Sequence, residues 1–307
     1  MPLIRSRIDQ TMKVVIEIGV LFVLVLMMVA VGTELEGRHF RAVARRKGLL
    51  LLTLASQAVV LPALGLLLIH FMQVPPHLSA GILLLAACPV GDMANFFTLL
   101  AQANLALSVT LNTISCLLSV VTMAVIFKAY GYVMGEHFVF AVPTPILIVR
   151  LTLMVVLPVL FGMLIRHFRP AFVVRYRKAV QTISIGGIVY LLVYIMVTQR
   201  ERLVVDWLQT AVAGMVFILL AMLSGFVFNR LLQLTARDGV TICIGFAVRN
   251  VGLALAIAVT LLNRIEFAIF AAVYFITEAP LLLGAVAVYR KWGAPVAKQA
   301  EVAGPPP

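Results

Sequence analysis

Long apolar runs constrain this chain more than any other feature of its sequence. A transmembrane helix needs about 20 consecutive apolar residues to cross a hydrocarbon layer roughly 30 Å thick. Nine such runs follow one another, and charged residues make up only 12% of the chain against 63% apolar residues. The pattern predicts an all-α polytopic membrane protein with nine transmembrane helices. The runs cover residues 12–33, 48–72, 78–102, 104–129, 143–166, 181–199, 207–229, 239–262 and 265–289.

The sequence contains no polar block long enough for a separate soluble domain. We expect an N-terminal segment at 1–11, one integral membrane domain at 12–290 and a disordered tail at 291–307, which ends in three prolines. The apolar part of the first run, Val14 to Gly32, is longer than the roughly 7–15 residues of a signal peptide core. It is therefore predicted to be a transmembrane helix.

The distribution of basic residues predicts the orientation in the membrane. With the N-terminus outside, the inner segments hold 15 Lys and Arg residues and the outer segments hold 7. Inner loops normally carry the excess of positive charge. The net charge of +12 therefore reflects topology and not a nucleic-acid partner. We expect a multi-pass protein of a bacterial inner (plasma) membrane, with its N-terminus outside and its C-terminus inside.

Two regions of the sequence resemble each other. ACPVGDMANFFTLLAQANLALSV and FAVRNVGLALAIAVTLLNRIEFAI each place polar residues within an apolar run, and an offset of 159 residues puts Gly91 on Asn250 and Asn104 on Asn263. Interrupted spans at corresponding places in two halves are typical of the binding site of a repeat-built transporter. The alignment therefore predicts an internal repeat.

The two regions differ in how strongly their residues predict a break. Pro89 lacks a backbone donor and Gly91 relaxes backbone sterics, so the third run is expected to contain a break. The eighth run has only Gly245 and Gly252 around Arg249. A kinked, continuous helix packed through small residues is the alternative for both runs.

Three charged side chains lie near the centres of predicted spans: Asp92, Arg249 and Glu278. A charge at the bilayer centre costs at least about 2.5–3.5 kcal/mol, so these side chains should face a cavity or a partner. If Arg249 neutralises one carboxylate, the other is left unpaired and is expected to hold a proton or a cation. A purely structural ion pair beside a permanently protonated acid is the alternative.

Uncharged polar residues add to the same central zone. Ser108 and Asn112 are four residues apart and share a helix face, Asn95 follows Asp92 by one turn, and Gln57 interrupts the second run. Oxygen-rich groups of this kind can coordinate a small hard cation. Each of these side chains can instead form an interhelical hydrogen bond. Gln57, Asn95, Ser108 and Asn112 are therefore the candidate ion-binding residues.

Taken together, these residues resemble the bile acid:sodium symporter family over residues 12–290. The motifs are Cys88-Pro89-Val90-Gly91 with Asn95 and Asn104 to Ser108, Gln57 with Pro62, and Arg249 to Ala254. The resemblance implies inverted repeats, two crossed discontinuous helices in a core domain and a separate panel domain. It also implies that the first family helix is absent, as in the nine-helix members.

The resemblance further implies where sodium would bind, and the chain departs from that pattern. The implied positions are Gln57, Ala94, Asn95, Ser108, Asn112, Gly245, Phe246, Val248 and Arg249. Gly245 stands where the family has a glutamate shared by two sodium ions, Arg249 where it has a glutamine, and Ala94 where it has a serine. We therefore expect no sodium at these positions and no cofactor. The hypothesis is that Arg249 replaces a sodium ion, with Asp92 as its compensating anion, which leaves proton-coupled and uncoupled transport open.

The sequence therefore predicts a secondary active transporter of a small or amphipathic organic anion, working by alternating access. Arg249 can bind a carboxylate or sulfonate with two parallel hydrogen bonds. The residues expected to line the substrate site are Asp92, Asn95, Arg249, Asn250 and Glu278.

Two other functions use the same residues. A metalloid or oxyanion exporter of similar architecture would use Cys88 as a ligand. An intramembrane aspartyl protease would use Asp92, but it needs a second central aspartate to share a proton, and Pro89 spoils its Gly-x-Gly-Asp pattern. The chain is therefore predicted not to be an enzyme.

Overall fold

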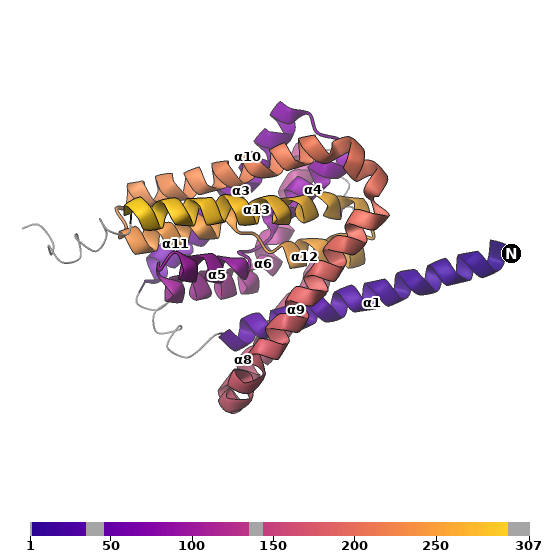
Figure 1. The fold of residues 1–307 in the computed structure, drawn as a ribbon, viewed down its shortest axis with the longest axis horizontal. Helices are drawn as coiled ribbons and strands as arrows, with labels where there is room; N and C mark the ends of the chain where they lie inside the picture. The colour runs from indigo at the N-terminus through magenta and orange to yellow at the C-terminus, as the bar shows by residue number, and fades with distance from the viewer. Residues whose placement is uncertain (1, 35–45, 135–143, 294–307) are drawn as a thin grey trace, which may run out of the picture.

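The computed structural model describes the backbone of residues 2–34, 46–134 and 144–293. It also describes the side chains in these ranges, except those at positions 2–17, 134, 144, 177 and 292. The regular elements of the described ranges are all helices, as the apolar runs predict (Figure 1). Most of the expected tail, 294–307, and the side chains of the expected segment 1–11 lie outside the described parts.

Most of the apolar runs form long helices, and two runs are divided into shorter ones. The long elements are α1 (Pro2–Glu34), α3 (Lys47–Met72), α6 (Leu105–Met134), α9 (Pro170–Thr198), α10 (Arg200–Leu232) and α13 (Ala268–Val288), with a π-helical end at Tyr289–Gly293. A π-helical turn, Thr152–Val156, joins α7 (Thr144–Leu151) to α8 (Leu157–Phe168). The third run is divided into α4 (Pro76–Ala87) and α5 (Met93–Leu100). The eighth run is divided into α11 (Ala236–Ala247) and α12 (Val251–Ala256), and α12 is followed by a π-helical turn at Ile257–Leu261.

The number of continuous spans differs from the nine that hydropathy predicts. Within the described residues, six helices are long and apolar enough to cross a membrane. The other three runs correspond to the described part of the first helix, Ile18–Glu34, and to the two divided runs. Hydropathy averages over about 20 residues, so it does not detect a break of a few residues in the backbone. The chain is an all-helical, multi-pass membrane protein.

The helices form two groups (Figure 1). Helices α3 to α6 and α10 to α13 lie together in one bundle, whereas α1, α8 and α9 lie beside it and pack on one another. Glycine permits a close contact between α1 and α8, because a Cβ atom at position 162 would lie 2.1 Å from the carbonyl oxygen of Val29. Such contacts through small residues are typical of helices in membranes.

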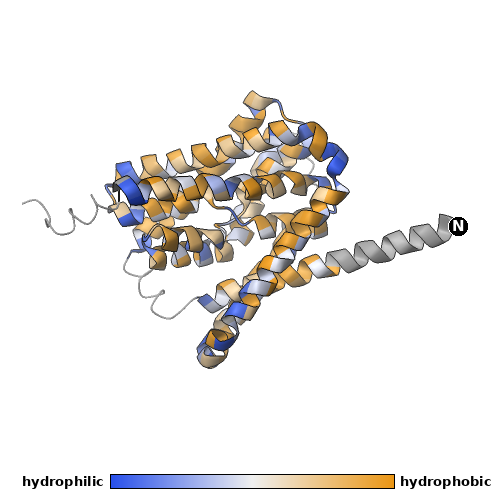
Figure 2. Ribbon diagram, viewed as in Figure 1, coloured by the Kyte–Doolittle hydropathy of each residue, from blue (hydrophilic) through white to orange (hydrophobic). Residues whose placement is uncertain are grey.

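The helices consist mostly of apolar residues along their length, and polar residues gather at the ends of the bundle (Figure 2). On α10, for example, Val204, Val205 and Leu208 are 81%, 82% and 74% exposed. An apolar surface of this extent is unusual on a soluble protein and suits contact with lipid. The hydropathy pattern and the fold therefore agree on a membrane-embedded protein.

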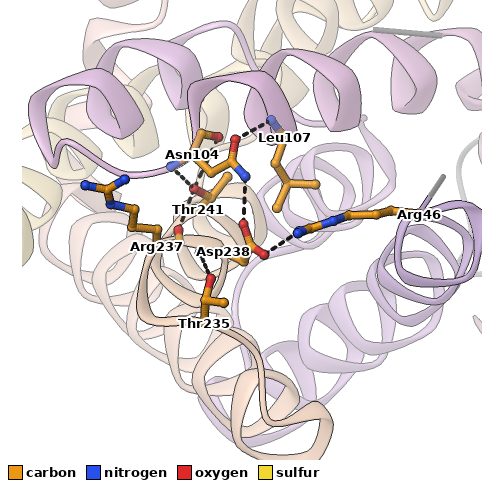
Figure 3. Close-up of polar contacts among 7 residues, drawn as sticks. All are labelled: Arg46, Asn104, Leu107, Thr235, Arg237, Asp238 and Thr241. Atoms are coloured by element: carbon orange, nitrogen blue, oxygen red, sulfur yellow. Dashed lines mark hydrogen bonds and ion pairs between the residues drawn. The ribbon is translucent and has the colours of Figure 1, made fainter. Parts of the chain in front are cut away.

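A polar cluster fixes the turn between α5 and α6 against the start of α11 (Figure 3). The buried Asp238 accepts hydrogen bonds from Asn104 Nδ2 at 2.7 Å and from Arg46 Nη1 at 2.5 Å. The backbone N–H of Asn104 donates to the Thr241 hydroxyl at 3.0 Å. Asn104 Oδ1 also accepts from the N–H of Leu107 and caps α6. One carboxylate thus ties together the first residues of α3, α6 and α11.

We expect Asp238→Ala to destabilise the protein by about 1–3 kcal/mol, because it removes the acceptor of a hydrogen bond that involves a charge. The control is Glu266→Ala, which removes an exposed ion pair to Arg264 at 3.3 Å and should cost about 0–1 kcal/mol. Unfolding of the two purified variants measures both effects. Equal losses would show that the buried cluster adds no more stability than a surface pair.

Candidate functional site

The two divided helices meet at their breaks in the middle of the bundle. Residues 88–92 and 248–250 are extended or irregular, and Val90 pairs with Arg249 in an antiparallel bridge. The N–H of Gly91 donates to Val248 O at 3.1 Å, and the N–H of Asn250 donates to Pro89 O at 2.9 Å. Backbone groups freed by a break cannot bond to lipid, so each break supplies partners for the other.

Local chemistry explains why the chain breaks at these positions. Pro89 has no N–H, and the N–H of Val90 is satisfied by the Ser115 hydroxyl of α6 at 3.1 Å. At Gly91 a Cβ atom would lie 2.5 Å from Arg249 O, so only glycine allows the two segments to approach this closely. Asn250 caps α12 by accepting from the N–H of Leu253 at 2.9 Å. The eighth run, whose break the sequence predicts less firmly, is broken too.

The guanidinium of Arg249 is held by backbone carbonyls from both divided helices. Nη2 donates to Cys88 O, at the end of α4, and Nη1 donates to Gly245 O in α11 at 3.4 Å. Arg249 is only 5% exposed, and its Nε has no hydrogen-bond partner among the described residues. The structure therefore places a fixed positive charge at the crossing, with the N–H of Nε left without an acceptor among the described residues.

Asp92 is not the ionic partner of Arg249, contrary to the hypothesis from the sequence. No ion pair joins the two side chains within the described parts of the chain; Asp92 Oδ1 instead accepts from Asn112 Nδ2 of α6 at 2.8 Å. The reason lies in the backbone. The carbonyls of Cys88 and Gly245 already take two donors of Arg249, and Asp92 begins α5 on the side that faces α6.

The carboxylate that lies within electrostatic range of Arg249 is Glu278 on α13. Glu278 is 2% exposed, and its Oε1 has no hydrogen-bond partner in the described structure. One turn earlier on α13, the hydroxyl of Tyr274 donates to Ala247 O, at the end of α11. This contact brings α13 against the second break, two residues before Arg249.

A second set of polar side chains extends from the crossing to α1. Asn95 Oδ1 accepts from the Ser108 hydroxyl at 2.8 Å, and Asn95 Nδ2 donates to Glu34 Oε2 at 2.9 Å. Glu34 is the last residue of α1. This set therefore links the divided helix α4–α5 to the group that contains α1, α8 and α9.

The residues at the implied sodium positions do not fit a sodium ion. Gly245 and Ala94 offer no side-chain oxygen, and Arg249 brings a positive charge. The side chains of Asn95, Ser108 and Asn112 are engaged in hydrogen bonds with their neighbours. The buried Gln57 has no partner for its Nε2, which lies 3.6 Å from the place that a Cβ atom of residue 245 would occupy. The described residues also contain no group of three His, Cys, Asp or Glu side chains able to hold a metal.

The structure thus brings together some of the predicted residues and separates others. Arg249 and Asn250 form the crossing, Asp92 joins Asn112, and Asn95 joins Ser108. Sequence reasoning missed Glu34 and Tyr274, although Tyr274 lies four residues before Glu278 and shares its helix face. It also missed the carbonyls that hold Arg249, because backbone acceptors leave no signal in side-chain type.

Comparison with known proteins places the chain in a family. A sequence model of the Sodium Bile acid symporter family matches residues 21–207, more than half of the chain. The chain belongs to this family. The match ends before the eighth apolar run, so the assignment of positions around Arg249 rests on the motif resemblance.

Several relatives align over a larger part of the chain. The "Uncharacterized sodium-dependent transporter YocS" of Bacillus subtilis is 24% identical over 76% of this chain and 71% of its own length. The "Probable sodium/metabolite cotransporter BASS1, chloroplastic" of Arabidopsis thaliana is 26% identical over 66% of this chain and 49% of its own length. The "Sodium/bile acid cotransporter 5" of Rattus norvegicus is 27% identical over 77% of this chain and 55% of its own length. The chain thus spans about half the length of the plant and rat relatives.

The family members are transporters and not enzymes. This confirms the prediction that the chain is not an enzyme. The exporter alternative gains no support either, since the contact that Cys88 makes at the crossing uses its carbonyl oxygen.

We expect the stability losses of Asp92→Ala and Arg249→Gln to add within about 0.5 kcal/mol, because the two side chains share no contact. Asp92→Ala and Asn112→Ala should instead show a coupling energy of about 0.5–3 kcal/mol, because they form one hydrogen bond. Unfolding of the single and double variants measures both cycles. If the coupling energy were as large in the first cycle as in the second, Asp92 and Arg249 would have to interact directly.

Proposed function

We propose that this protein is a secondary active transporter of a small or amphipathic organic anion, and that the anion binds at the helix crossing. The observation that carries the proposal is the buried Arg249, fixed by carbonyls of both divided helices with its Nε unpartnered. A guanidinium is suited to bind a carboxylate or sulfonate. Asp92, Asn95, Asn250 and Glu278 are proposed to line the same site.

We propose that the chain contains an inverted repeat and works by alternating access. α4 and α11 are both 12 residues long, and α11 begins 160 residues after α4. The helix before each ends at a glutamine with positive φ, Gln73 and Gln233, at the same separation. The antiparallel bridge between Val90 and Arg249 is the pairing that two inverted copies would make. Transporters with such repeats expose their central site to either side in turn.

We assign the boundary between the two helix groups as the interface that moves during transport. We assign the bundle of α3 to α6 and α10 to α13 as the core domain, and α1, α8 and α9 to the panel domain (Figure 1). Nine membrane-crossing segments, an N-terminus outside and a bacterial inner membrane are part of the same proposal. The hydrogen bond between Asn95 and Glu34 would then cross the interface between core and panel.

Flux measurements test the proposal directly. The full chain is reconstituted into liposomes, and entry of labelled taurocholate and pyruvate is measured as an amphipathic sulfonate and a small carboxylate. Saturable uptake of either anion, lost in Arg249→Gln but retained in the control Glu266→Gln, supports the proposal. If neither anion enters faster than into protein-free liposomes, or if Arg249→Gln transports normally, the proposed site is wrong.

We expect uptake to be unchanged when potassium replaces sodium at constant pH and membrane potential, because Gly245 and Arg249 do not provide a sodium site. We further expect the double variant Gly245→Glu/Arg249→Gln to regain uptake only when sodium is present, because a bound sodium ion would restore the positive charge that Arg249→Gln removes. A side chain can be added at residue 245, where a Cβ atom meets only Gln57 Nε2 within 4 Å.

The matched control is Gly245→Gln/Arg249→Gln, in which the side chain at residue 245 has the same size but no carboxylate. Sodium-dependent uptake by the unmodified protein would contradict the first expectation. Equal sodium responses of the two double variants would contradict the second.

A further inference from the structure

The buried carboxyl group of Glu278 has a position that the anion site alone does not explain. Its Oε1 is buried without a hydrogen-bond donor among the described residues, and no ion pair there joins it to Arg249. A buried carboxylate without a donor or a contacting cation is costly. In this conformation the hydrogen bonds of the Arg249 Nη atoms go to the backbone carbonyls of Gly245 and Cys88, and none goes to Glu278.

Among the described charged side chains, Arg249 is the one that interacts electrostatically with Glu278. Arg249 and Tyr274 are the described groups within electrostatic range of Glu278. Of the elements packed against α13, α5 and α12 contain no titratable residue. Glu266 pairs with Arg264, and the described charged residues of α9, of the ends of α10 and of Tyr289–Gly293 do not act on Glu278. On α4 and α10, His77 and Asp206 pair with each other at 3.0 Å. Gly214 of α10 lies beside Tyr274 and Thr277 and adds no charge.

The charges of Arg249 and Glu278 determine which ion can cross the membrane together with a bound anion. With the site empty, Arg249 and Glu278 together carry no net charge. Asp92, which accepts a hydrogen bond from Asn112, contributes the same charge before and after an anion binds. A bound monoanion adds one negative charge, and moving a net charge through a low-dielectric barrier is unfavourable. One added proton returns the loaded site to the net charge that it has when empty.

We propose that Glu278 is the proton site of the transporter, and that one proton crosses the membrane with each monoanion. The proton is taken from water on the side to which the site is open and forms an O–H bond at the Glu278 carboxyl group. After reorientation it leaves to water on the opposite side, when the anion dissociates from Arg249. This inference rests on the proposed function and adds the coupling ion to it.

An infrared measurement tests the proton site without any substrate. Difference spectra of the reconstituted full chain are recorded while the buffer is cycled between mildly acidic and mildly alkaline pH. We expect a carboxyl C=O band that appears and disappears with pH, shifts in heavy water and is absent from Glu278→Gln. The band should remain in Glu266→Gln and Asp92→Asn. If the unmodified protein and Glu278→Gln give the same pH-difference spectra, Glu278 exchanges no proton and the proposal is overturned.

Glu278→Asp keeps the measurement decisive if Glu278→Gln does not fold. The aspartate variant retains a carboxyl group, so a proton-exchanging band should persist at a shifted frequency. An unchanged spectrum in this variant would mean that the band belongs to another residue and would overturn the assignment.

A transport measurement tests the coupling. Taurocholate is the probe because its sulfonate remains ionised and cannot itself carry a proton across the bilayer. With the membrane potential clamped, inward taurocholate flux should acidify the liposome lumen, as read by a trapped pH-sensitive dye, and this acidification should be lost in Glu278→Gln. Taurocholate entry without acidification would overturn the coupling while leaving the proposed function intact. If taurocholate does not enter at all, the proposed function is questioned, and the infrared measurement still decides on Glu278.

Discussion

The buried contact between two broken helices is the interaction on which the rest of the structure depends. A broken helix leaves backbone donors and acceptors that lipid cannot satisfy. Here each break supplies partners for the other through Gly91, Asn250 and their opposing carbonyls. The guanidinium of Arg249 adds bonds to both segments, so the residue that introduces a charge also helps to close the backbone network.

This arrangement separates the central charges instead of pairing them. Asp92 is bound by Asn112 of α6, whereas Glu278 faces Arg249 from α13 without touching it. A tight ion pair would lock the crossing and leave no charge for a ligand. A guanidinium held by carbonyls is not neutralised by a contacting carboxylate among the described residues, and this arrangement underlies the roles proposed for Arg249 and Glu278.

The residues of the candidate site could be predicted from their types, but their hydrogen-bond partners could not. The cost of a charge in hydrocarbon singles out Asp92, Arg249 and Glu278 from the sequence. Pro89 and Gly91 likewise mark the first break. The partner of Arg249 could not be predicted, because its acceptors are carbonyls that every residue possesses. Glu34 was missed because its contact with Asn95 joins residues that are distant in the chain.

The sequence by itself determined that this is an all-helical membrane protein, because apolar runs of about 20 residues have the length of helices that cross lipid with their backbone groups satisfied internally. The family also followed from motifs around Pro89 and Gly91. Only the tertiary structure decided where the second break lies, which helix faces Asp92 and what holds Arg249. These outcomes depend on distances between segments about 160 residues apart, and such distances are set by how helices pack and not by the residues of any one segment.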